Sequence, residues 1–400
     1  MPFLVYASIF NINNQYPTHL RRDQTRKMKS HYYFLQLDLY FGNYKFALLC
    51  FITAFVVTLI TIPPIISLIK KHNLYDKPNA RKVHSIPIPT MGGIAIVAGM
   101  MMGLFLWFPF SNVAPQISFF FSIAVLLALG IMDDLKDLSA KYKFIVQAGL
   151  AALIALSGIR ITSLDGLFGI YDLPITAQYT FTFLIIVGVT NAFNLIDGID
   201  GLAGGLGFMS LTILGLFLTM SGDANTALIA FSLAGGILAF MYFNLNPARI
   251  FMGDTGSLML GFVVAVLCIR MTQVNIVVTN PVFPHALVFV AAIVFIPIFD
   301  TVRVFATRIW KGKSPFVADR THIHHLLTNQ GFSHAFATKL ICVIHGIVLI
   351  EVYWLRGLPQ ELILVILVAF MLLTTVILKN LGLFIREKGS VSGDPVRNAD

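Results

Sequence analysis

Carboxylates are concentrated where the apolar segments of this chain end. Nearly all of its nineteen acidic residues are aspartates. An ionisable residue beside an apolar run is costly to place there and is a candidate for function. Several loops contribute one or more: Asp76, Asp133, Asp134, Asp137, Asp197, Asp200, Asp254, Asp300 and Asp319. If these loops converge on one face, they form an acidic site suited to a metal ion and phosphate groups.

The first motif is the adjacent pair Asp133 and Asp134, which is followed by Lys141 and Lys143. Two neighbouring carboxylates repel each other, which raises one pKa and leaves a base beside an ionised partner. The lysines could hold a phosphate. Paired aspartates are also common at helix ends, so this motif indicates catalysis only together with the others.

The second motif is Asn191-Ala-Phe-Asn194-Leu-Ile-Asp197-Gly-Ile-Asp200-Gly-Leu, with a polar side chain at every third position. Three residues of an α-helix turn through about 300°, so these side chains would fan over half of the helix surface. The pattern indicates a helix end that opens onto a cavity, where the glycines let a ligand or a backbone come close. Small-residue packing would explain the glycines but not the amides and carboxylates.

The third motif, Phe251-Met-Gly253-Asp254-Thr255-Gly256-Ser257, places a carboxylate between glycines just before an apolar segment. The amino terminus of the following helix adds N–H donors and a favourable dipole, which suits a metal or phosphate site. Asp254 could equally be a helix N-cap, because Asp, Thr and Ser all cap helices.

The fourth motif is Asp319-Arg320-Thr-His322-Ile-His324-His325. Three histidines could bind zinc, but their spacing matches none of the usual zinc patterns and no cysteine lies nearby. Histidines beside Arg320 are better suited to contacts with phosphate or with sugar hydroxyls.

A basic loop, Asp76–His84, leads to the fifth motif, Pro89-Thr90-Met91-Gly92-Gly93. Proline and glycine punctuate the start of a helix here. The loop could hold a lipid phosphate, or it could be an ordinary basic loop of a membrane protein.

The composition predicts the elements that position these motifs. The chain is 57% hydrophobic and 12% charged, and its apolar residues come in long blocks. About 20 apolar residues span a bilayer core, and such spans must be helical. The alternating ten-residue segments of a β-barrel are absent from the sequence. We therefore expect an all-α integral membrane protein with about eleven transmembrane helices, over 46–69, 92–109, 117–132, 143–158, 179–194, 204–220, 225–243, 256–271, 284–305, 339–355 and 361–384.

Basic residues follow the odd-numbered spans, and the positive-inside rule places those loops in the cytoplasm. The amino terminus is then outside and the carboxyl terminus cytoplasmic. Basic residues at 21–29 disagree, unless they lie too far from the membrane to count or translation starts at Met28. We divide the chain into an N-terminal extension (1–44), a transmembrane domain (45–385) and a cytoplasmic tail (386–400).

The formal net charge is +9, but the basic residues form no domain that could bind a nucleic acid. The charge fits loops attracted to anionic lipid and phosphate. Cys50, Cys268 and Cys342 lie far apart in apolar runs and suggest neither a disulfide framework nor a metal site.

In this order, the five motifs resemble those of the polyprenyl-phosphate N-acetylhexosamine-1-phosphate transferase family. The resemblance covers roughly residues 45–385, and Asn191–Leu202, Phe251–Ser257 and His322–His325 are its most specific parts. It implies a multi-pass enzyme of the plasma (inner) membrane with a cytoplasmic active site. Such an enzyme moves a sugar 1-phosphate from a UDP-N-acetyl-sugar onto a polyprenyl phosphate and releases UMP.

The His-Ile-His-His form is similar to the branch that uses UDP-N-acetylglucosamine and initiates surface polysaccharides. Pro89–Gly93 is also found in the branch that uses UDP-N-acetylmuramoyl pentapeptide, which stays open as an alternative. The family's lysine just upstream of Thr90 is absent, and His84 and Ser85 lie there instead.

The resemblance also implies roles for individual residues. Asp254 and Asn194 are the expected ligands of Mg²⁺, or of Mn²⁺ in its place, because Mg²⁺ uses one or two carboxylates together with substrate phosphates. Asp133 is the expected base toward the lipid phosphate. The other expected catalytic residues are Asp134, Lys143 and Asp197. The expected substrate-binding residues are Thr90, Asn191, Asp200 and Phe251 (these last two for uracil), and Arg320, His322, His324 and His325 for the sugar or the pyrophosphate.

A membrane transporter with an acidic ion pathway is the rival class. Its acids should lie near the bilayer midplane, whereas these lie at segment ends on one side. The sequence leaves open the exact sugar, the lipid length and whether the chain forms a homodimer.

Overall fold

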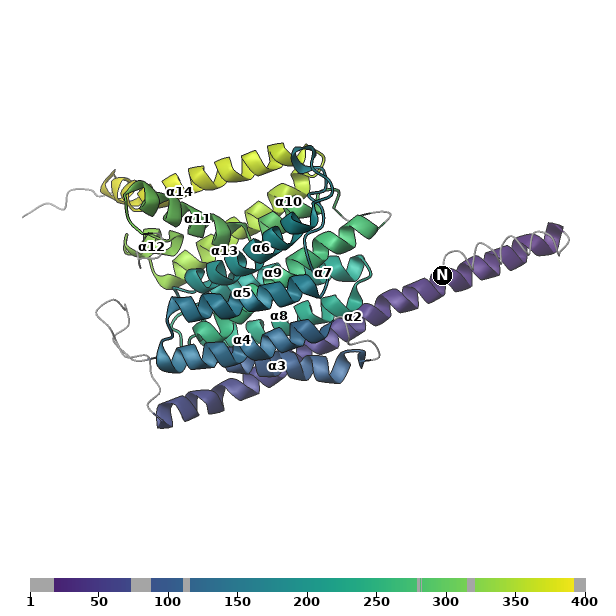
Figure 1. Ribbon diagram of the computed structural model, residues 1–400, viewed down its shortest axis with the longest axis horizontal. Helices are drawn as coiled ribbons and strands as arrows, with labels where there is room; N and C mark the ends of the chain where they lie inside the picture. Colours follow the sequence, from purple (N-terminus) through teal and green to yellow (C-terminus); the bar gives the residue numbers. More distant parts are fainter. Residues whose placement is uncertain are drawn as a thin grey trace, which may run out of the picture.

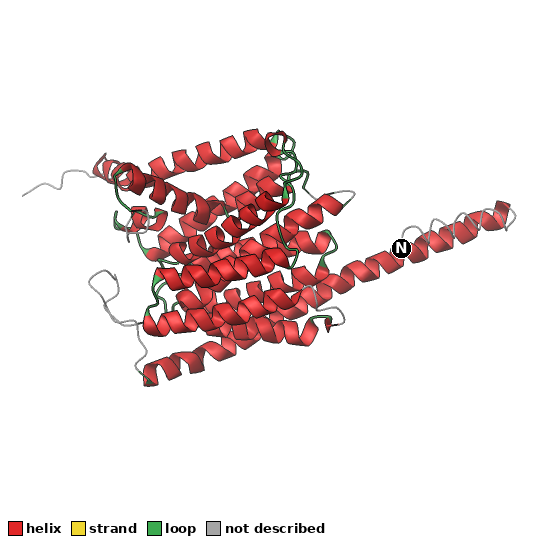
Figure 2. Ribbon diagram, viewed as in Figure 1, coloured by secondary structure: helices red, strands yellow, loops and turns green. Residues whose placement is uncertain are grey.

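The computed structural model describes residues 18–72, 88–110, 116–278, 281, 283–314 and 321–391, with side chains described from Tyr44 to Gly382 within these ranges. The described residues are helices joined by loops (Figure 2), which confirms the predicted all-α class. In chain order the elements are α2 (Thr18–Lys71), α3 (Gly92–Trp107), α4 (Ile117–Lys136), α5 (Ala140–Leu156), the 3₁₀ turn η3 (Leu167–Gly169), α6 (Ile175–Ile196), α7 (Leu202–Met220), α8 (Ala224–Asn244), α9 (Gly253–Val277), α10 (Ala286–Ile293), α11 (Phe295–Trp310), α12 (Ile323–Thr328), α13 (His334–Leu355) and α14 (Gln360–Val391).

Each apolar segment predicted from the sequence falls on one of these helices, except 284–305, which is divided between α10 and α11. Within the described ranges, eight helices are long and apolar enough to cross a membrane, and a bent pair raises this to nine if it counts as one span. The apolar helix α3 is shorter, at 16 residues. The chain is therefore a multi-pass helical membrane protein.

One predicted span, 284–305, is broken in the structure. Helices α10 and α11 meet at Val294 with a bend of 71°. Pro297 explains the break, because it has no N–H to donate to the carbonyl of Ile293 one turn earlier. The hydroxyl of Ser210 on α7 bonds that carbonyl instead, at 3.1 Å. The sequence pattern missed the break because the apolar run continues through it.

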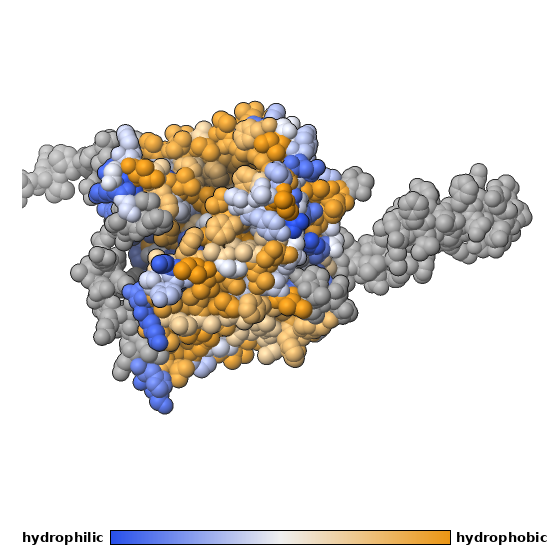
Figure 3. Space-filling view, viewed as in Figure 1, coloured by the Kyte–Doolittle hydropathy of each residue, from blue (hydrophilic) through white to orange (hydrophobic). Residues whose placement is uncertain are grey.

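Helix α9 lies in the middle of the bundle and packs against α3, α4, α6, α7 and α10 (Figure 1). Most of α7, α8 and α9 is buried in protein, whereas only a minority of residues is buried in Tyr44–Lys71 of α2 and in Gln360–Gly382 of α14. The visible surface is largely apolar, with polar residues gathered toward the two ends of the helices (Figure 3). This distribution is the one expected for a bundle surrounded by lipid.

Four helix ends meet at one end of this bundle. Helices α4 and α6 finish there, while α5 and α9 begin there, and polar side chains of all four touch one another. Because α9 is central, its first turn is surrounded by the other three ends. The motifs at Asp133, Lys143, Asn194 and Asp254 are thus brought together although they are far apart in sequence.

Candidate active site

Lys143 is the centre of the charged cluster where these helix ends meet. Its Nζ donates to Asp133 Oδ2 at 2.9 Å and to Asp254 Oδ2 at 2.8 Å. Asn194 Nδ2 donates to Asp254 Oδ1 at 2.9 Å and to Ser257 Oγ at 2.9 Å. A single cation therefore joins two carboxylates from different helices, and an amide completes the contacts of one of them.

Asp134, the neighbour of Asp133, plays a different part. It accepts from the backbone N–H groups of Asp254 and Thr255 at 2.8 and 3.2 Å, and from the Thr255 hydroxyl at 2.6 Å. A carboxylate from α4 thus caps the amino terminus of α9, where N–H groups lack partners within the helix and the dipole favours negative charge. Asp134 fixes the position of the first turn of α9, and with it Asp254.

The alternative that Asp254 is the N-cap of α9 is wrong. The cap position is Met252, which makes no side-chain cap bond. The carboxylate of Asp254 instead faces Lys143 and Asn194. Its charge is therefore available to the cluster.

The backbone of the fifth motif forms hydrogen bonds with the segment that leads into α9. Phe251 N donates to Pro89 O at 2.8 Å, and the N–H groups of Gly92 and Gly93 donate to Phe251 O and Met252 O, each at 2.9 Å. Thr90 therefore lies beside Phe251, its partner among the expected substrate-binding residues. The two motifs form one structural unit.

Glycine is required at Gly253, where the chain turns into α9. Its φ of 71° lies in the left-handed region, and a Cβ there would lie 2.6 Å from Asp134 Oδ2. Both the conformation and the space exclude a larger residue.

The four polar residues of the second motif lie in four different environments. Asn194 joins the charged cluster, whereas Asn191 lies one turn deeper and donates to Gln147 Oε1 of α5 at 2.6 Å. Asp197 caps the end of α6 and is partly buried. Loss of hydration, with the charges of Asp254 and other nearby aspartates, raises the pKa of Asp197 to about 7.

Asp200 is only 2% exposed. Its carboxylate accepts from Asn246 Nδ2 at 3.0 Å and Ala248 N at 3.3 Å, and lies 3.3 Å from His334 Nδ1. Burial alone would raise the pKa of Asp200, but the bonds from His334 and Asn246 outweigh it and lower the pKa. Asp200 therefore ties α13 and the loop after α8 to this turn, and its contact with a uracil stays a prediction.

The histidine motif packs against the second motif. The ring of His324 lies so close to Gly198 that a Cβ there would be 2.3 Å from His324 Nε2. Burial, followed by the nearby charge of His325, lowers the pKa of His324 to about 3, so its imidazole is neutral at pH 7. His322 Nδ1 bonds Asp300 Oδ2 at 2.8 Å. Arg320 lies outside the described residues.

Two functional candidates were not assigned to the site from the sequence. Gln147 accepts a hydrogen bond from Asn191. Its position one turn after Lys143 was the sequence feature that could have assigned it to the site. Asp300 was noted only as one of many aspartates. Its signal was stronger, because a carboxylate inside a predicted span needs a partner.

The cluster fits the chemistry of magnesium. Asp254 supplies a hard carboxylate, and Asn194 could turn its amide oxygen toward a cation. Within the described ranges, no three His, Cys, Asp or Glu side chains are placed to hold a metal together. Mg²⁺ is commonly bound by one or two protein carboxylates plus substrate phosphates and water, so a sparse set of protein ligands is compatible with it.

Comparison with known proteins identifies the family. A sequence model described as glycosyl transferase family 4 matches residues 116–272. The chain is 33% identical over 346 residues to a probable undecaprenyl-phosphate N-acetylglucosaminyl 1-phosphate transferase of Bacillus subtilis (strain 168), covering 84% of this chain and 93% of that protein. It is 36% identical over 282 residues to the undecaprenyl-phosphate alpha-N-acetylglucosaminyl 1-phosphate transferase of Escherichia coli (strain K12), covering 68% and 74%. The protein of that name from Yersinia pestis is 35% identical over 278 residues, covering 68% and 74%.

The chain therefore belongs to glycosyl transferase family 4, and it is a membrane-embedded transferase. This confirms the family predicted from the order of the motifs.

Proposed function

We propose that this enzyme transfers N-acetylglucosamine 1-phosphate from UDP-N-acetylglucosamine to a polyprenyl phosphate and releases UMP. The observation that carries the proposal is the position of Lys143, which joins Asp133 to Asp254 where four helix ends meet. The names of the relatives support the sugar and the lipid. The product is a lipid diphosphate sugar that can initiate a cell-surface polysaccharide.

The reaction brings two anions together. A phosphate oxygen of the lipid attacks the β-phosphorus of the UDP-sugar, the bond from that phosphorus to the bridging oxygen breaks, and UMP leaves with this oxygen. Two unit charges about 4 Å apart repel by about 4 kcal/mol at an effective dielectric constant of 20. Catalysis is therefore mostly positioning and neutralisation of charge.

Lys143 and Asp133 act on the acceptor. The ammonium group holds the lipid phosphate beside the cluster, and the salt bridge to Asp133 keeps it in place. A phosphate monoester has a second pKa near 6 and is largely dianionic at pH 7. Asp133 thus needs only to orient the acceptor and to take the last proton when one is present.

Asp254, with Asn194, would hold Mg²⁺. A bound magnesium ion would neutralise the phosphates of the donor and the charge that develops on the leaving UMP. The cap from Asp134 places Asp254 for this role before any substrate arrives. Asp197 has a pKa raised to about 7 beside these aspartates, and a bound divalent cation would favour its ionised form.

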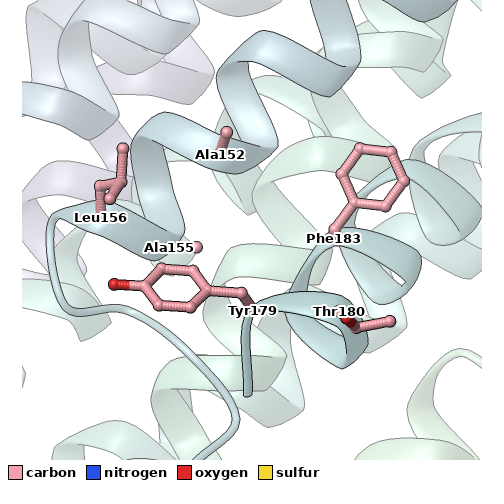
Figure 4. Close-up of a pocket in the computed structure, with 6 residues that line it drawn as sticks. All are labelled: Ala152, Ala155, Leu156, Tyr179, Thr180 and Phe183. Atoms are coloured by element: carbon pink, nitrogen blue, oxygen red, sulfur yellow. The ribbon is translucent and has the colours of Figure 1, made fainter. Parts of the chain in front are cut away.

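A groove between α5 and α6 suits the prenyl chain of the acceptor. It is lined by Ala152, Ala155, Leu156, Tyr179, Thr180 and Phe183 (Figure 4). Ala152 lies nine residues after Lys143 on the same helix, about 13.5 Å along its axis at a rise of 1.5 Å per residue. Ala152→Trp should raise the KM for polyprenyl phosphate several-fold and leave the KM for the UDP-sugar unchanged. An unaltered KM for the lipid would remove the groove from the acceptor site.

We further propose that the chain crosses the plasma membrane about eleven times, with its amino terminus outside and the cluster on the cytoplasmic face. The support is the basic residues of the loops that follow the odd-numbered spans. Single cysteines introduced at Ser139 and Ser221, at opposite ends of the bundle, test it. A membrane-impermeant thiol reagent applied to intact cells should label only the cysteine at 221, and labelling at 139 would reverse the orientation.

The proposed reaction is tested with purified protein, polyprenyl phosphate and a panel of UDP-sugars that includes UDP-N-acetylmuramoyl pentapeptide. We expect lipid product from UDP-N-acetylglucosamine and an equal amount of UMP. Release of UDP would mean transfer of the sugar without its phosphate and would refute the reaction type. Preference for the muramoyl donor would refute the sugar assignment alone.

A further inference from the structure

Asp300 lies on α11, two turns after the α10–α11 break, and is 1% exposed. One oxygen, Oδ2, bonds His322 Nδ1 at 2.8 Å. The other, Oδ1, accepts from Ile323 N at 2.9 Å and from Arg303 Nη2 at 2.7 Å. Arg303 Nη2 also bonds the carbonyl of Thr321. One buried carboxylate thus fastens the start of α12 to α11.

This contact determines where the proton of His322 lies. A carboxylate accepts hydrogen bonds, so Nδ1 must carry its proton toward Asp300. The other ring nitrogen, Nε2, is then the atom left to meet a substrate. His322 is 6% exposed, and its bond to Asp300 orients the ring.

The ring of His322 contacts the next histidine of the motif. It is parallel to the ring of His324, with an interplanar angle of 5° and centroids 5.8 Å apart. His324 in turn lies against Gly198, between Asp197 and Asp200. A chain of contacts therefore runs from Asp300 through two histidines to the turn beside the charged cluster.

A buried ion pair with Arg303 could serve stability alone. That role would not require His322, since Arg303 already supplies a positive partner for Asp300. The second oxygen is nevertheless directed at the imidazole. Carboxylates that bond one imidazole nitrogen fix the tautomer and orientation of the ring in many sites.

We infer that Asp300 is a positioning residue, which fixes the tautomer of His322 and holds the histidine motif against the Asp197–Asp200 turn. The inference rests on the proposed function in that the histidine motif is taken to contact the nucleotide-sugar. Asp300 touches no substrate and acts through His322.

The decisive variant is Asp300→Asn. It keeps the volume and an oxygen acceptor for Arg303 and Ile323, but it directs an N–H group at His322 Nδ1. The imidazole must then accept at Nδ1 and carry its proton on Nε2. We expect kcat to fall at least about 100-fold, the KM for polyprenyl phosphate to stay within about threefold, and the melting temperature to change little.

The matched control is Arg303→Gln, which removes the buried ion pair and leaves the bond between Asp300 and His322. If Asp300 served stability alone, Arg303→Gln would lose as much activity as Asp300→Asn. We expect a much smaller loss. The double variant Asp300→Asn/His322→Ala should be no slower than His322→Ala alone, because Asp300 acts through that ring. Independent, multiplying losses would overturn the inference.

The tautomer itself provides a readout that is independent of turnover. In wild-type protein with ¹⁵N-labelled histidine, the resonances lost in His322→Ala should show a proton on Nδ1, and Asp300→Asn should move it to Nε2. A wild-type proton on Nε2 alone would overturn the inference, even if Asp300→Asn failed to fold. If the wild type bound UDP-sugar but transferred none, the proposed function would fail while the NMR result still decided the role of Asp300.

Discussion

Gly130 on α4 provides a test of how closely the cluster depends on backbone packing. A Cβ at this position would lie 2.3 Å from Thr255 Cα and 2.7 Å from Thr255 N. Carbon atoms in contact are about 3.5–4.0 Å apart, so Gly130→Ala must move α4 and the first turn of α9 apart by roughly 1.2 Å. No side chain can rotate away, because both obstructing atoms belong to the backbone.

This displacement would change the distances between the catalytic residues. Thr255 follows Asp254 and bonds Asp134, so the separation of the helices stretches the cap and moves Asp254 away from Lys143. A misplacement of about 1 Å can cost about 100-fold in rate. We therefore expect kcat of Gly130→Ala to fall about 100-fold in the transfer assay with purified protein.

Gly149 supplies the matched control. It lies inside α5, and a Cβ there would have no atom within 4 Å. Alanine favours a helix over glycine by about 1 kcal/mol, so Gly149→Ala should keep full activity and melt slightly higher. Activity of Gly130→Ala within about threefold of this control would refute the reasoning that close backbone contact positions the site.

Three further predictions concern the polar residues. Asp133→Asn removes one of the two salt bridges of Lys143 and the proposed base. Turnover should fall by orders of magnitude while calorimetry still detects UDP-sugar binding; near-normal turnover would take Asp133 out of the chemistry. Gly198→Ala should impair transfer because its Cβ meets the ring of His324, yet it should add no loss in a His324→Ala background, where additive losses would contradict the steric account. Without magnesium, Asp197→Asn should raise the melting temperature more at pH 8 than at pH 5. The pKa of about 7 means that the fold disfavours ionised Asp197, so native stability falls as pH rises from about 4 through 7; equal shifts at both pH values would contradict this.

The sequence predicted the helices well, because long apolar blocks leave a chain in lipid little choice but helix. It did not predict the break at Val294. A single proline two turns before the end of an apolar run can bend a helix or leave it almost straight, depending on what satisfies the freed carbonyl. Here the partner is Ser210 on α7, more than eighty residues away in sequence, and no local pattern contains that contact.

The site was predicted only in part, because its contacts also join residues that are far apart in sequence. The motifs identified Asp133, Asn194 and Asp254, but local spacing could not assign a role to each carboxylate. Asp254 could cap a helix or bind a ligand, and the pair Asp133 and Asp134 could be catalytic or an ordinary feature of a helix end. The choice depended on contacts between α4 and α9, where Asp134 Oδ1 meets Asp254 N across 120 positions of sequence.

The histidine motif shows the same limit. Its spacing argued against a zinc site but gave no indication of what fixes the rings. Asp300 is 22 residues before His322 on a different helix, and no local pattern contains that contact. The order of the motifs, which identified the family, was therefore a better guide to function than the local chemistry of any one of them.

The central claim is that Asp254 carries the charge needed for metal-dependent phosphoryl transfer. The most direct test compares wild type with Asp254→Asn in the formation of labelled lipid from UDP-N-acetylglucosamine across a magnesium titration. Asn preserves the size of the side chain and removes the charge. We expect wild type to require magnesium and Asp254→Asn, although folded and extracted normally, to form no product at any magnesium concentration. Retained transfer with an unchanged magnesium response would contradict it.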